Sequence, residues 1–490
     1  MPSPKTQPAR GMRDFLPADV RKREYVIGVI KQVYERYGFE PLETPAVENI
    51  ETLMGKYGEE GNQLIFKILK RGEHEKTGEA DLALRYDLTV PLARVVAQYQ
   101  NDLPKFFKRY QIQPVWRADR PARGRFREFY QCDVDVLGSR SMVVEAELIA
   151  AASDALVALG FKDFTIRVNH RKLMDAHMAA SMIDKDKRVA ALAILDKLDK
   201  IGLEAVKTEL SSLGIRGEGA QTILYRMMNR KFLAQTGRLE LHQFSTNRPA
   251  ANLEMLNFQY ASFRGLRSDP EIETAASESI LQLTEIVQLT KETSAASHVE
   301  IDPSLVRGLS YYTGTIMEIS VEGIGSLGGG GRYDNLVGMF LGRDVPACGF
   351  SLGLERIIVV MSEREMFPEQ LIASPADVMV TLWSEDSIAE SIALASELRS
   401  QGLRVDLYPE ADKLAKQFKY ASARGISFVA IIGDEERAKG EVAIKDMRSG
   451  EQQSVARAGV ANILETLGLR SRVADLRTVG EADDSIKPGA

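Results

Sequence analysis

Apolar residues fall at helical spacing in the first well-patterned stretch of the chain. Between Pro17 and Gly38 they recur every three or four positions, which predicts one long amphipathic helix. Asp19 is its possible N-cap and Gly38 its stop. Residues 39–45 contain two prolines and are predicted to be extended, because each proline disfavours helix at the residue before it.

Residues 106–137 have the pattern of a strand, a loop and a second strand. Five arginines lie between positions 117 and 127, interrupted by a proline and a glycine, so the predicted hairpin has a cationic tip. On the second strand apolar residues alternate with Gln131, Asp133 and Asp135. One face therefore belongs to a core, and the other presents two carboxylates and an amide either to solvent or to a ligand.

The next stretches change from mixed to helical patterning. Residues 143–159 predict a helix and 164–170 a strand, whereas 171–295 are largely helical with few strand signals. Alternation resumes at 315–319, and a helix is predicted from Leu354. Four consecutive glycines at 328–331, between two strand-like segments, predict a turn that faces a ligand.

A Ser-Pro pair at 374–375 marks a linker to a smaller unit. Strand-like stretches at 377–382, 403–408 and 426–433 are separated by predicted helices and followed by a hairpin at about 441–456 and a last helix. This order predicts an α/β domain with a mixed sheet.

Length and composition limit the possible functions. With 490 residues, two or three domains are expected. A net charge of −6 gives no global electrostatic case for nucleic acid, so contacts with RNA would need local basic patches. Two cysteines and five histidines supply neither a disulfide framework nor metal-ligand spacing, and a reducing cytosol fits best. The sequence contains no run of about 18 apolar residues, so no membrane span is predicted.

Several polar residues are candidates for a binding site. Asp87 and Thr89 stand where a strand passes into a helix, either as a cap and a satisfied hydroxyl or as acceptors for a substrate ammonium. The octapeptide Arg307-Gly308-Leu309-Ser310-Tyr311-Tyr312-Thr313-Gly314 alone fits a tight turn before a core strand, with two half-buried phenols. The arginines of the hairpin could hold phosphate or carboxylate bidentately.

Taken together, these stretches resemble histidyl-tRNA synthetases, a family of class II aminoacyl-tRNA synthetases. Residues 17–45 resemble class II motif 1, residues 106–137 motif 2 and residues 347–356 motif 3, while the octapeptide resembles the histidine-specific motif. The C-terminal unit is similar to the anticodon-binding domain of the histidyl, glycyl, prolyl and threonyl enzymes.

The resemblance implies an α+β fold with an antiparallel class II sheet of six or seven strands and flanking helices. It also implies a helical insertion domain and a C-terminal α/β anticodon-binding domain. The expected division is a disordered leader at 1–10, a catalytic domain at 11–170 and 296–370, the insertion at 171–295, the anticodon-binding domain at 376–470 and a disordered tail at 471–490.

The implied activity is ATP-dependent attachment of L-histidine to tRNA(His) through a histidyl-adenylate, with Mg²⁺ on the ATP phosphates. A cytoplasmic homodimer without membrane contact is expected. Arg307 and Arg117 match the family's catalytic positions, and no side chain is expected to bind a metal. The positions matched for histidine are Asp87, Leu88, Thr89, Arg117, Gln131, Asp135, Arg307, Tyr311 and Tyr312; those for ATP are Arg117, Asp119, Arg125 and Arg356.

Within this set, Asp135 and Tyr312 suit the two nitrogens of an imidazole ring, because a carboxylate accepts from one N–H and a phenol serves the other nitrogen. One departure is Ser310, where the family usually has Asp, which puts the orientation of Arg307 in question. The main alternative is a catalytically silent, histidine-sensing paralogue that acts as a regulatory subunit of ATP phosphoribosyltransferase. Such paralogues typically lack the C-terminal domain and the arginines kept here.

Overall fold

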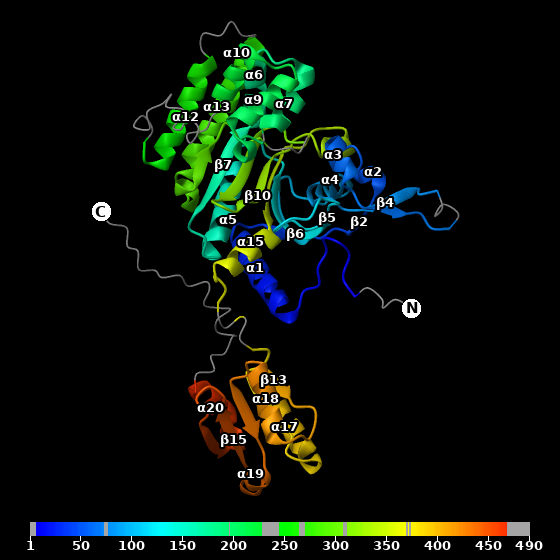
Figure 1. The fold of residues 1–490 in the computed structure, drawn as a ribbon, viewed down its shortest axis with the longest axis vertical. Coiled ribbons are helices and arrows are strands. Elements are labelled where there is room, and N and C mark those ends of the chain that lie inside the picture. Colours follow the sequence, from blue (N-terminus) through cyan, green and yellow to red (C-terminus); the bar gives the residue numbers. More distant parts are fainter. Residues whose placement is uncertain are drawn as a thin grey trace. The chain divides into compact units, whose positions relative to one another are not determined.

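The computed structural model describes residues 6–72, 77–195, 197–227, 245–263, 270–306, 311–368, 371 and 374–467. The chain forms two compact units, Met1–Met366 and Phe367–Ala490 (Figure 1). In the described part, no helix is long and apolar enough to cross a membrane.

An eight-stranded sheet is the centre of the first unit, in the order β1-β5-β6-β11-β10-β9-β7-β8. Its inner pairs are antiparallel, as predicted, and its two edge pairs are parallel. Six or seven strands were expected; the two edge strands, which have only two and three residues, bring the number in the described part to eight. The strands are β1 (Glu40–Pro41), β5 (Phe107–Trp116), β6 (Glu128–Leu137), β7 (Phe164–His170), β8 (Val299–Ile301), β9 (Thr315–Val321), β10 (Gly325–Arg332) and β11 (Ala347–Gly353).

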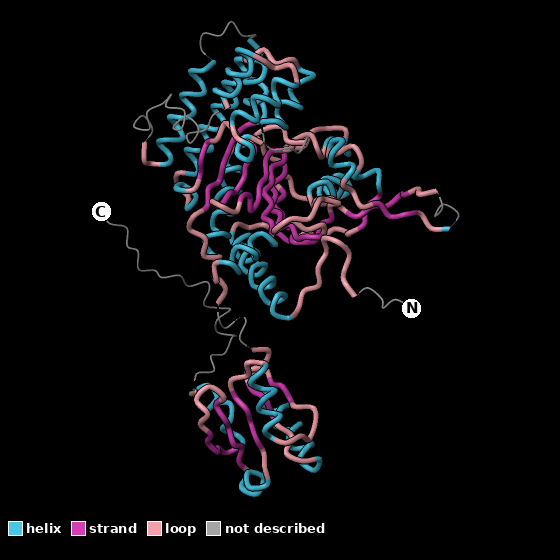
Figure 2. Tube along the Cα trace, viewed as in Figure 1, coloured by secondary structure: helices cyan, strands magenta, loops and turns pink. Residues whose placement is uncertain are grey.

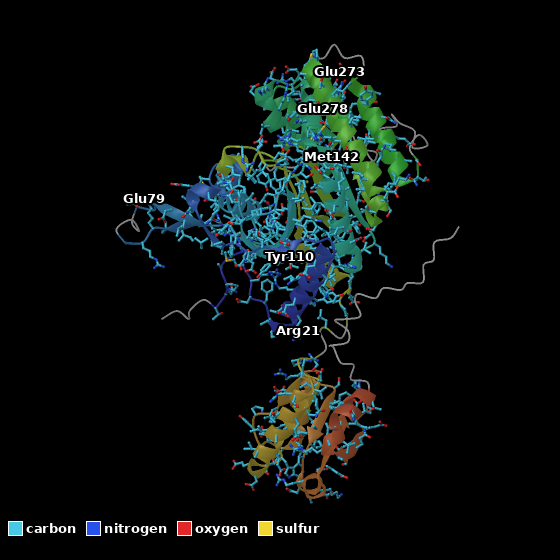
Figure 3. All side chains as sticks on the ribbon, turned by 180° about the vertical axis from the view of Figure 1, so that it is seen from behind. Arg21, Glu79, Tyr110, Met142, Glu273 and Glu278 are labelled. Carbon is cyan, nitrogen blue, oxygen red and sulfur yellow. The ribbon has the colours of Figure 1, made fainter. Side chains whose placement is uncertain are left out.

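Three helices pack on one side of this sheet: α1 (Pro17–Arg36), α5 (Val143–Ala158) and α15 (Leu354–Glu363). The hydroxyl of Tyr110 on β5 donates to Glu35 of α1 at 2.8 Å, and Tyr110 lies close to this helix in Figure 3. Helix α1 begins with its proline, and its N-cap position is Leu16. The prediction that Asp19 is the N-cap is therefore wrong; this residue lies in the first turn, where a carboxylate favours the helix dipole.

A smaller three-stranded sheet has the order β2-β4-β3, and the residues that follow β4 and α3 bond to the chain at the end of β5, through Trp116 N–H to Arg85 and Ala118 N–H to Leu64. Helix α4 packs near this smaller sheet, and both contribute to one apolar cluster that includes Tyr57, Tyr86, Tyr311 and Tyr333. The elements are β2 (Val47–Asn49), α2 (Ile50–Leu53), α3 (Gly58–Gln63), β3 (Lys67–Leu69), β4 (Ala80–Leu84), α4 (Thr89–Gln98) and α14 (Gly338–Leu341).

The stretch predicted to be helical is helical in its described parts. Its helices are α6 (Arg171–Ala180), α7 (Arg188–Leu195), α8 (Leu198–Ile201), α9 (Leu203–Ser212), α10 (Gly217–Arg226), α12 (Arg248–Phe263) and α13 (Pro270–Thr290). Figure 1 shows α6, α7, α9 and α10 beyond one end of β7. Helices α6 to α10 build a core of their own, which Leu305, Val306 and Ile316 join. Helix α13 also packs on α5 and β7, and α12 packs on β8. The boundaries of an insertion domain within 171–295 remain a prediction.

The glycine run is not a turn, as was predicted, but the middle of strand β10. A Cβ atom on Gly330 would lie 2.0 Å from the carbonyl oxygen of Gly349 on the neighbouring strand. The glycines therefore permit close approach of β10 to β11, and tertiary pairing outweighs the low strand propensity of glycine.

The second unit contains a mixed five-stranded sheet in the order β13-β12-β14-β15-β16, with helices packed on it (Figure 2). The first three strands are parallel and the others antiparallel, which confirms the predicted α/β domain. Its elements are β12 (Val378–Val380), α17 (Ile388–Ser400), β13 (Val405–Leu407), α18 (Leu414–Ala423), β14 (Phe428–Ile431), α19 (Asp434–Lys439), β15 (Glu441–Asp446), β16 (Gln452–Ala456) and α20 (Val460–Thr466).

Candidate active site

A cavity of about 1500 Å³ lies against the central sheet and continues to the ends of helices α7 and α8. Strand β6 explains why it is polar: Cys132 and Val134 are fully buried in the core, whereas the alternate residues of the strand line the cavity, namely Gln131, Asp133 and Asp135. The polar face of the predicted hairpin thus faces a cavity and not bulk solvent. The predicted site residues that line it are Asp87, Thr89, Arg117, Asp119, Arg125, Gln131, Asp135, Tyr311, Tyr312 and Arg356.

Strand register brings Asp135 to the centre of this wall. It pairs with Arg109 on β5 and with Gly349 on β11, and directly opposed residues share one face of a sheet. A Cβ atom on Gly349 would lie 1.9 Å from Oδ1 of Asp135. The carboxylate therefore occupies space that only a glycine at position 349 leaves open.

Asp135 is buried and held from two sides. Its Oδ2 lies 2.8 Å from Nη2 of Arg109, and its Oδ1 accepts a hydrogen bond from the hydroxyl of Tyr333. Burial raises the pKa of Asp135, while the charge of Arg109 and the hydrogen bond from Tyr333 act in the opposite direction. Both oxygens therefore have fixed positions before any substrate arrives.

Two further polar groups continue the wall along β6. Gln131 donates through Nε2 to the hydroxyl of Ser351 at 3.0 Å, and Asp133 lies across from Ser351 in the ladder. Oδ2 of Asp133 is 4.0 Å from Nη2 of Arg109. Burial raises the pKa of Asp133, and Arg109 again opposes the shift.

Sequence reasoning assigned no role to Arg109, Asp133, Tyr333 or Ser351. A signal for the first was present, because Arg109, Gln111 and Gln113 recur with period two on β5 and pair with the polar face of β6. Tyr333 and Ser351 stand on distant segments, and no local pattern points to their contact with β6.

Asp87 bonds to the first turn of helix α4 and is part of the cavity wall. Its Oδ1 accepts the backbone N–H of Val90 at 3.0 Å and the hydroxyl of Tyr57 at 2.9 Å. Its Oδ2 accepts the hydroxyl of Tyr311 at 3.3 Å. Burial raises the pKa of Asp87. The N-cap position of α4 is Leu88, one residue later than predicted, although the carboxylate of Asp87 still accepts an N–H of the first turn. The role of Asp87 as an acceptor for a substrate ammonium remains a prediction.

The two residues that follow Asp87 differ in placement. Thr89 lines the cavity. The side chain of Leu88 is fully buried and does not line the cavity, and its carbonyl oxygen lies 3.4 Å from Nη2 of Arg109. Leu88 thus contributes to this region through its backbone.

Arg117 is held at the start of the hairpin loop. Its Nε donates to the carbonyl oxygen of Tyr86 at 3.1 Å, and its guanidinium lies 4.3 Å from the ring of Tyr86 and 5.2 Å from the ring of Phe129. Aromatic rings and one hydrogen bond thus orient a permanent cation at the cavity wall.

The other three residues predicted to bind ATP lie near one another at the loop end of the cavity. Arg125 and Asp119 form a bidentate pair, with nitrogen–oxygen distances of 2.9 and 3.1 Å. Arg356 on α15 donates through Nη1 to the carbonyl oxygen of Ser326, and its Cγ lies 3.2 Å from an ideal Cβ on Gly124 of the loop. The structure thus brings the hairpin loop and the start of α15 together.

The predicted catalytic Arg307 and its neighbours to position 310 lie outside the described residues. Val306 and Tyr311, on either side of them, both line the cavity, and Tyr312 lies beside Tyr311 with ring centroids 5.0 Å apart. Among the residues that the structure describes, no group of three His, Cys, Asp or Glu side chains could hold a metal ion.

Comparison with known proteins shows which family the chain belongs to. The sequence profile of histidyl-tRNA synthetase matches residues 11–357, and the profile of an anticodon binding domain matches residues 377–467. A histidine–tRNA ligase of Porphyromonas gingivalis is 40% identical over 464 residues, which cover 91% of this chain and 95% of that protein. The corresponding ligase of Gloeobacter violaceus is 38% identical over 481 residues, 93% of this chain and 97% of that protein.

Solved structures agree with the sequence relatives. A crystal structure of histidyl-tRNA synthetase from Nostoc sp. matches with a TM-score of 0.75 and 32% identity, over 94% of this chain and 99% of that one. An ATP phosphoribosyltransferase regulatory subunit/histidyl-tRNA synthetase from Bacillus halodurans matches at 21% identity with a TM-score of 0.64, which shows a shared fold only. On the strength of the profile and the close relatives, the chain belongs to the histidyl-tRNA synthetase family.

Proposed function

We propose that this chain is a histidine–tRNA ligase, which joins L-histidine to ATP as histidyl-adenylate and then transfers the histidyl group to tRNA(His). The observation that carries the proposal is a single cavity with buried carboxylates at one end and arginines at the other. Such a cavity can hold a cationic amino acid beside a polyphosphate.

At the carboxylate end, Asp87 is suited to the α-ammonium group, with Thr89 and the backbone of Leu88 close to it. Asp135 is suited to one N–H of the imidazole ring. Tyr312 is proposed for the other ring nitrogen, while Tyr311 and Gln131 line the space between. An amino acid without the ring N–H would leave one acceptor position of the buried Asp135 carboxylate unfilled, which disfavours its binding.

At the arginine end, the chemistry requires two anions to meet: the carboxylate of histidine and the α-phosphate of ATP. Fixed cations oppose their repulsion without reorganisation during the reaction. Arg117 is proposed to bridge the carboxylate and the α-phosphate, Arg307 to act beside the same phosphate, and Arg356 to contact the γ-phosphate. No side-chain nucleophile is needed, because the substrate carboxylate attacks.

Arg125 and Asp119 are proposed to contact the phosphates and the adenine amino group, respectively. They pair with each other in this structure, so ATP would have to exchange that ion pair for its own contacts. The exchange is inexpensive because the side chain of Arg125 is about half exposed.

Mg²⁺ is proposed to accompany ATP and to neutralise phosphate charge. Asp119 and Glu355 line the cavity together with Arg125 and Arg356, and each of these two carboxylates already pairs with an arginine. The residues present therefore fit a metal ion that is held mainly by phosphate oxygens.

The remaining proposals rest on the family. The second unit is proposed to contact the anticodon arm of tRNA(His), and the helices between 171 and 295 to approach its acceptor arm. A cytoplasmic homodimer is proposed as the working form.

The test is ATP–pyrophosphate exchange with each of the twenty amino acids, without tRNA. We expect exchange with histidine alone, and loss of that exchange in Asp135→Asn. Asp412→Asn, in the second unit, is the matched control and should keep full exchange. Absence of exchange while histidine still binds would overturn the proposal in favour of a histidine-sensing regulatory subunit.

A further inference from the structure

Arg109 is buried on β5 beside the carboxylates of the cavity wall, and it has no assigned role. Its side chain is fully buried, and Nη2 is within 4.0 Å of both Asp135 and Asp133 and 3.4 Å from the carbonyl oxygen of Leu88. Arg109 does not line the cavity; it is directly opposed to Asp135 in the β5–β6 ladder, so it reaches the carboxylate sideways from the neighbouring strand on the same face of the sheet.

The hydrogen bonding of Arg109 differs from that of an arginine with a purely structural role. Among the described residues, its Nε and Nη1 atoms have no hydrogen-bond partner. The equally buried Arg85 bonds to the carbonyl oxygens of Pro114, Thr44 and Pro45. Burial of a cation whose N–H groups lack acceptors costs free energy. Arg109 therefore differs from Arg85 in that its charge, more than its hydrogen bonds, accounts for its place beside the carboxylates.

The charges around the ring end of the cavity explain what that cation does. Three buried carboxylates, Asp87, Asp133 and Asp135, belong to the cavity wall, and Arg109 makes the closest ion pair with them. Without it, Asp135 would face Asp133 and Asp87 in a low dielectric with only the hydroxyl of Tyr333 to stabilise its charge. A protonated Asp135 would be a poorer acceptor for an imidazole N–H.

We propose that Arg109 is a positioning residue for the imidazole ring of the substrate: from the neighbouring strand it holds the Asp135 carboxylate ionised and fixed, so that the carboxylate can accept the ring N–H. This inference rests on the proposed function. It makes Arg109, which touches no substrate, a determinant of histidine specificity through Asp135.

The inference predicts a particular change with pH. The groups that face Asp135 are Arg109 from β5, Tyr333 from the segment after β10, Asp133 from its own strand and Asp87 from the start of α4. Loss of the one cation in this set raises the pKa of Asp135. The acidic limb of kcat/KM for histidine should therefore move to higher pH.

The experiment compares Arg109→Met and Arg109→Lys with wild type in ATP–pyrophosphate exchange across pH. In Arg109→Met we expect KM for histidine to rise roughly 10- to 100-fold, with KM for ATP nearly unchanged, together with the shifted acidic limb. Arg109→Lys keeps a charge and should recover part of both effects. Arg85→Met is the matched control, because it also removes a buried arginine but should lower thermal stability without moving the acidic limb.

An unchanged acidic limb and an unchanged KM for histidine in folded, active Arg109→Met would overturn the inference. The inference would also be overturned if Arg85→Met and Arg109→Met moved the acidic limb by the same amount, since the effect would then be structural. Folding of each variant is checked by thermal melting. If Arg109→Met does not fold, Arg109→Lys is compared with wild type instead, and a smaller rise in KM for histidine and a smaller shift of the acidic limb are expected; no change in either would overturn the inference. Wild-type protein without histidine-dependent exchange would instead refute the proposed function itself.

Discussion

Replacement of Gly349 by alanine tests the geometry of the cavity at its tightest point. The added Cβ would lie 1.9 Å from Oδ1 and 2.6 Å from Cγ of Asp135, whereas ordinary contacts begin at about 3.4 Å. The carboxylate or the strand must therefore move by about 1.5 Å, the difference between 3.4 and 1.9 Å. Neither can retreat freely, because Arg109 and Tyr333 hold the two oxygens and the strands are in register.

The expected cost follows from those contacts. A displacement of this size breaks the hydrogen bond from Tyr333 and weakens the pair with Arg109, and misplacement of a positioning group by about 1 Å can cost roughly 100-fold in rate. We therefore expect kcat/KM for histidine to fall about 100-fold, equivalent to about 2.7 kcal/mol. Overpacking should lower the free energy of unfolding by about 1–3 kcal/mol.

The assay is histidine-dependent ATP–pyrophosphate exchange, with urea unfolding measured in parallel. Gly28→Ala is the matched control: Gly28 lies in α1, and a Cβ there meets nothing within 4 Å. That control should keep full activity and be slightly more stable, by about 0.4–1 kcal/mol. If Gly349→Ala keeps kcat/KM for histidine within about twofold of wild type, Asp135 does not meet the ring in the way proposed.

Four other predictions concern charge. Burial raises the pKa of Asp87, so above the ordinary carboxyl pKa the folded protein binds more protons than the unfolded chain. The contribution of Asp87 to the free energy of unfolding, measured in urea, should therefore be lost as pH rises through the raised pKa. Burial lowers the pKa of His170 to about 4, so stability should fall as pH falls from about 6.5 towards 4, with a smaller slope in His170→Gln. Arg23→Met leaves Glu355 buried without its ion-pair partner and should cost about 3–5 kcal/mol in urea unfolding, part of which Glu355→Gln recovers in the double variant. Arg356→Met should raise KM for ATP in pyrophosphate exchange and leave KM for histidine unchanged.

The elements with a clear period were predictable from the sequence. Helix α1 and strand β7 match their predicted extents closely, and the hairpin of β5 and β6 was recognised from alternation. Where a residue's conformation depends on its neighbours in space, the pattern misled: the glycine run became strand β10 because β9 and β11 pair with it on both sides.

The candidate site was predictable as a set of chemical groups but not as a set of contacts. Motif resemblance selected Asp135, and the alternation of β6 put it on a polar face. Its partners could not be chosen in this way, since Arg109 is 26 residues away and Tyr333 is 198 residues away along the chain.

The sequence by itself determined the order and type of most elements, the division into a large α+β part and a small α/β part, and the charged groups available for chemistry. These properties follow from periods and residue types within short segments. Tertiary structure decided which groups meet: Arg109 with Asp135, Arg125 with Asp119, and a glycine opposite the carboxylate at position 135. Strand register and the docking of loops set those distances, and both depend on packing between segments that no local period records.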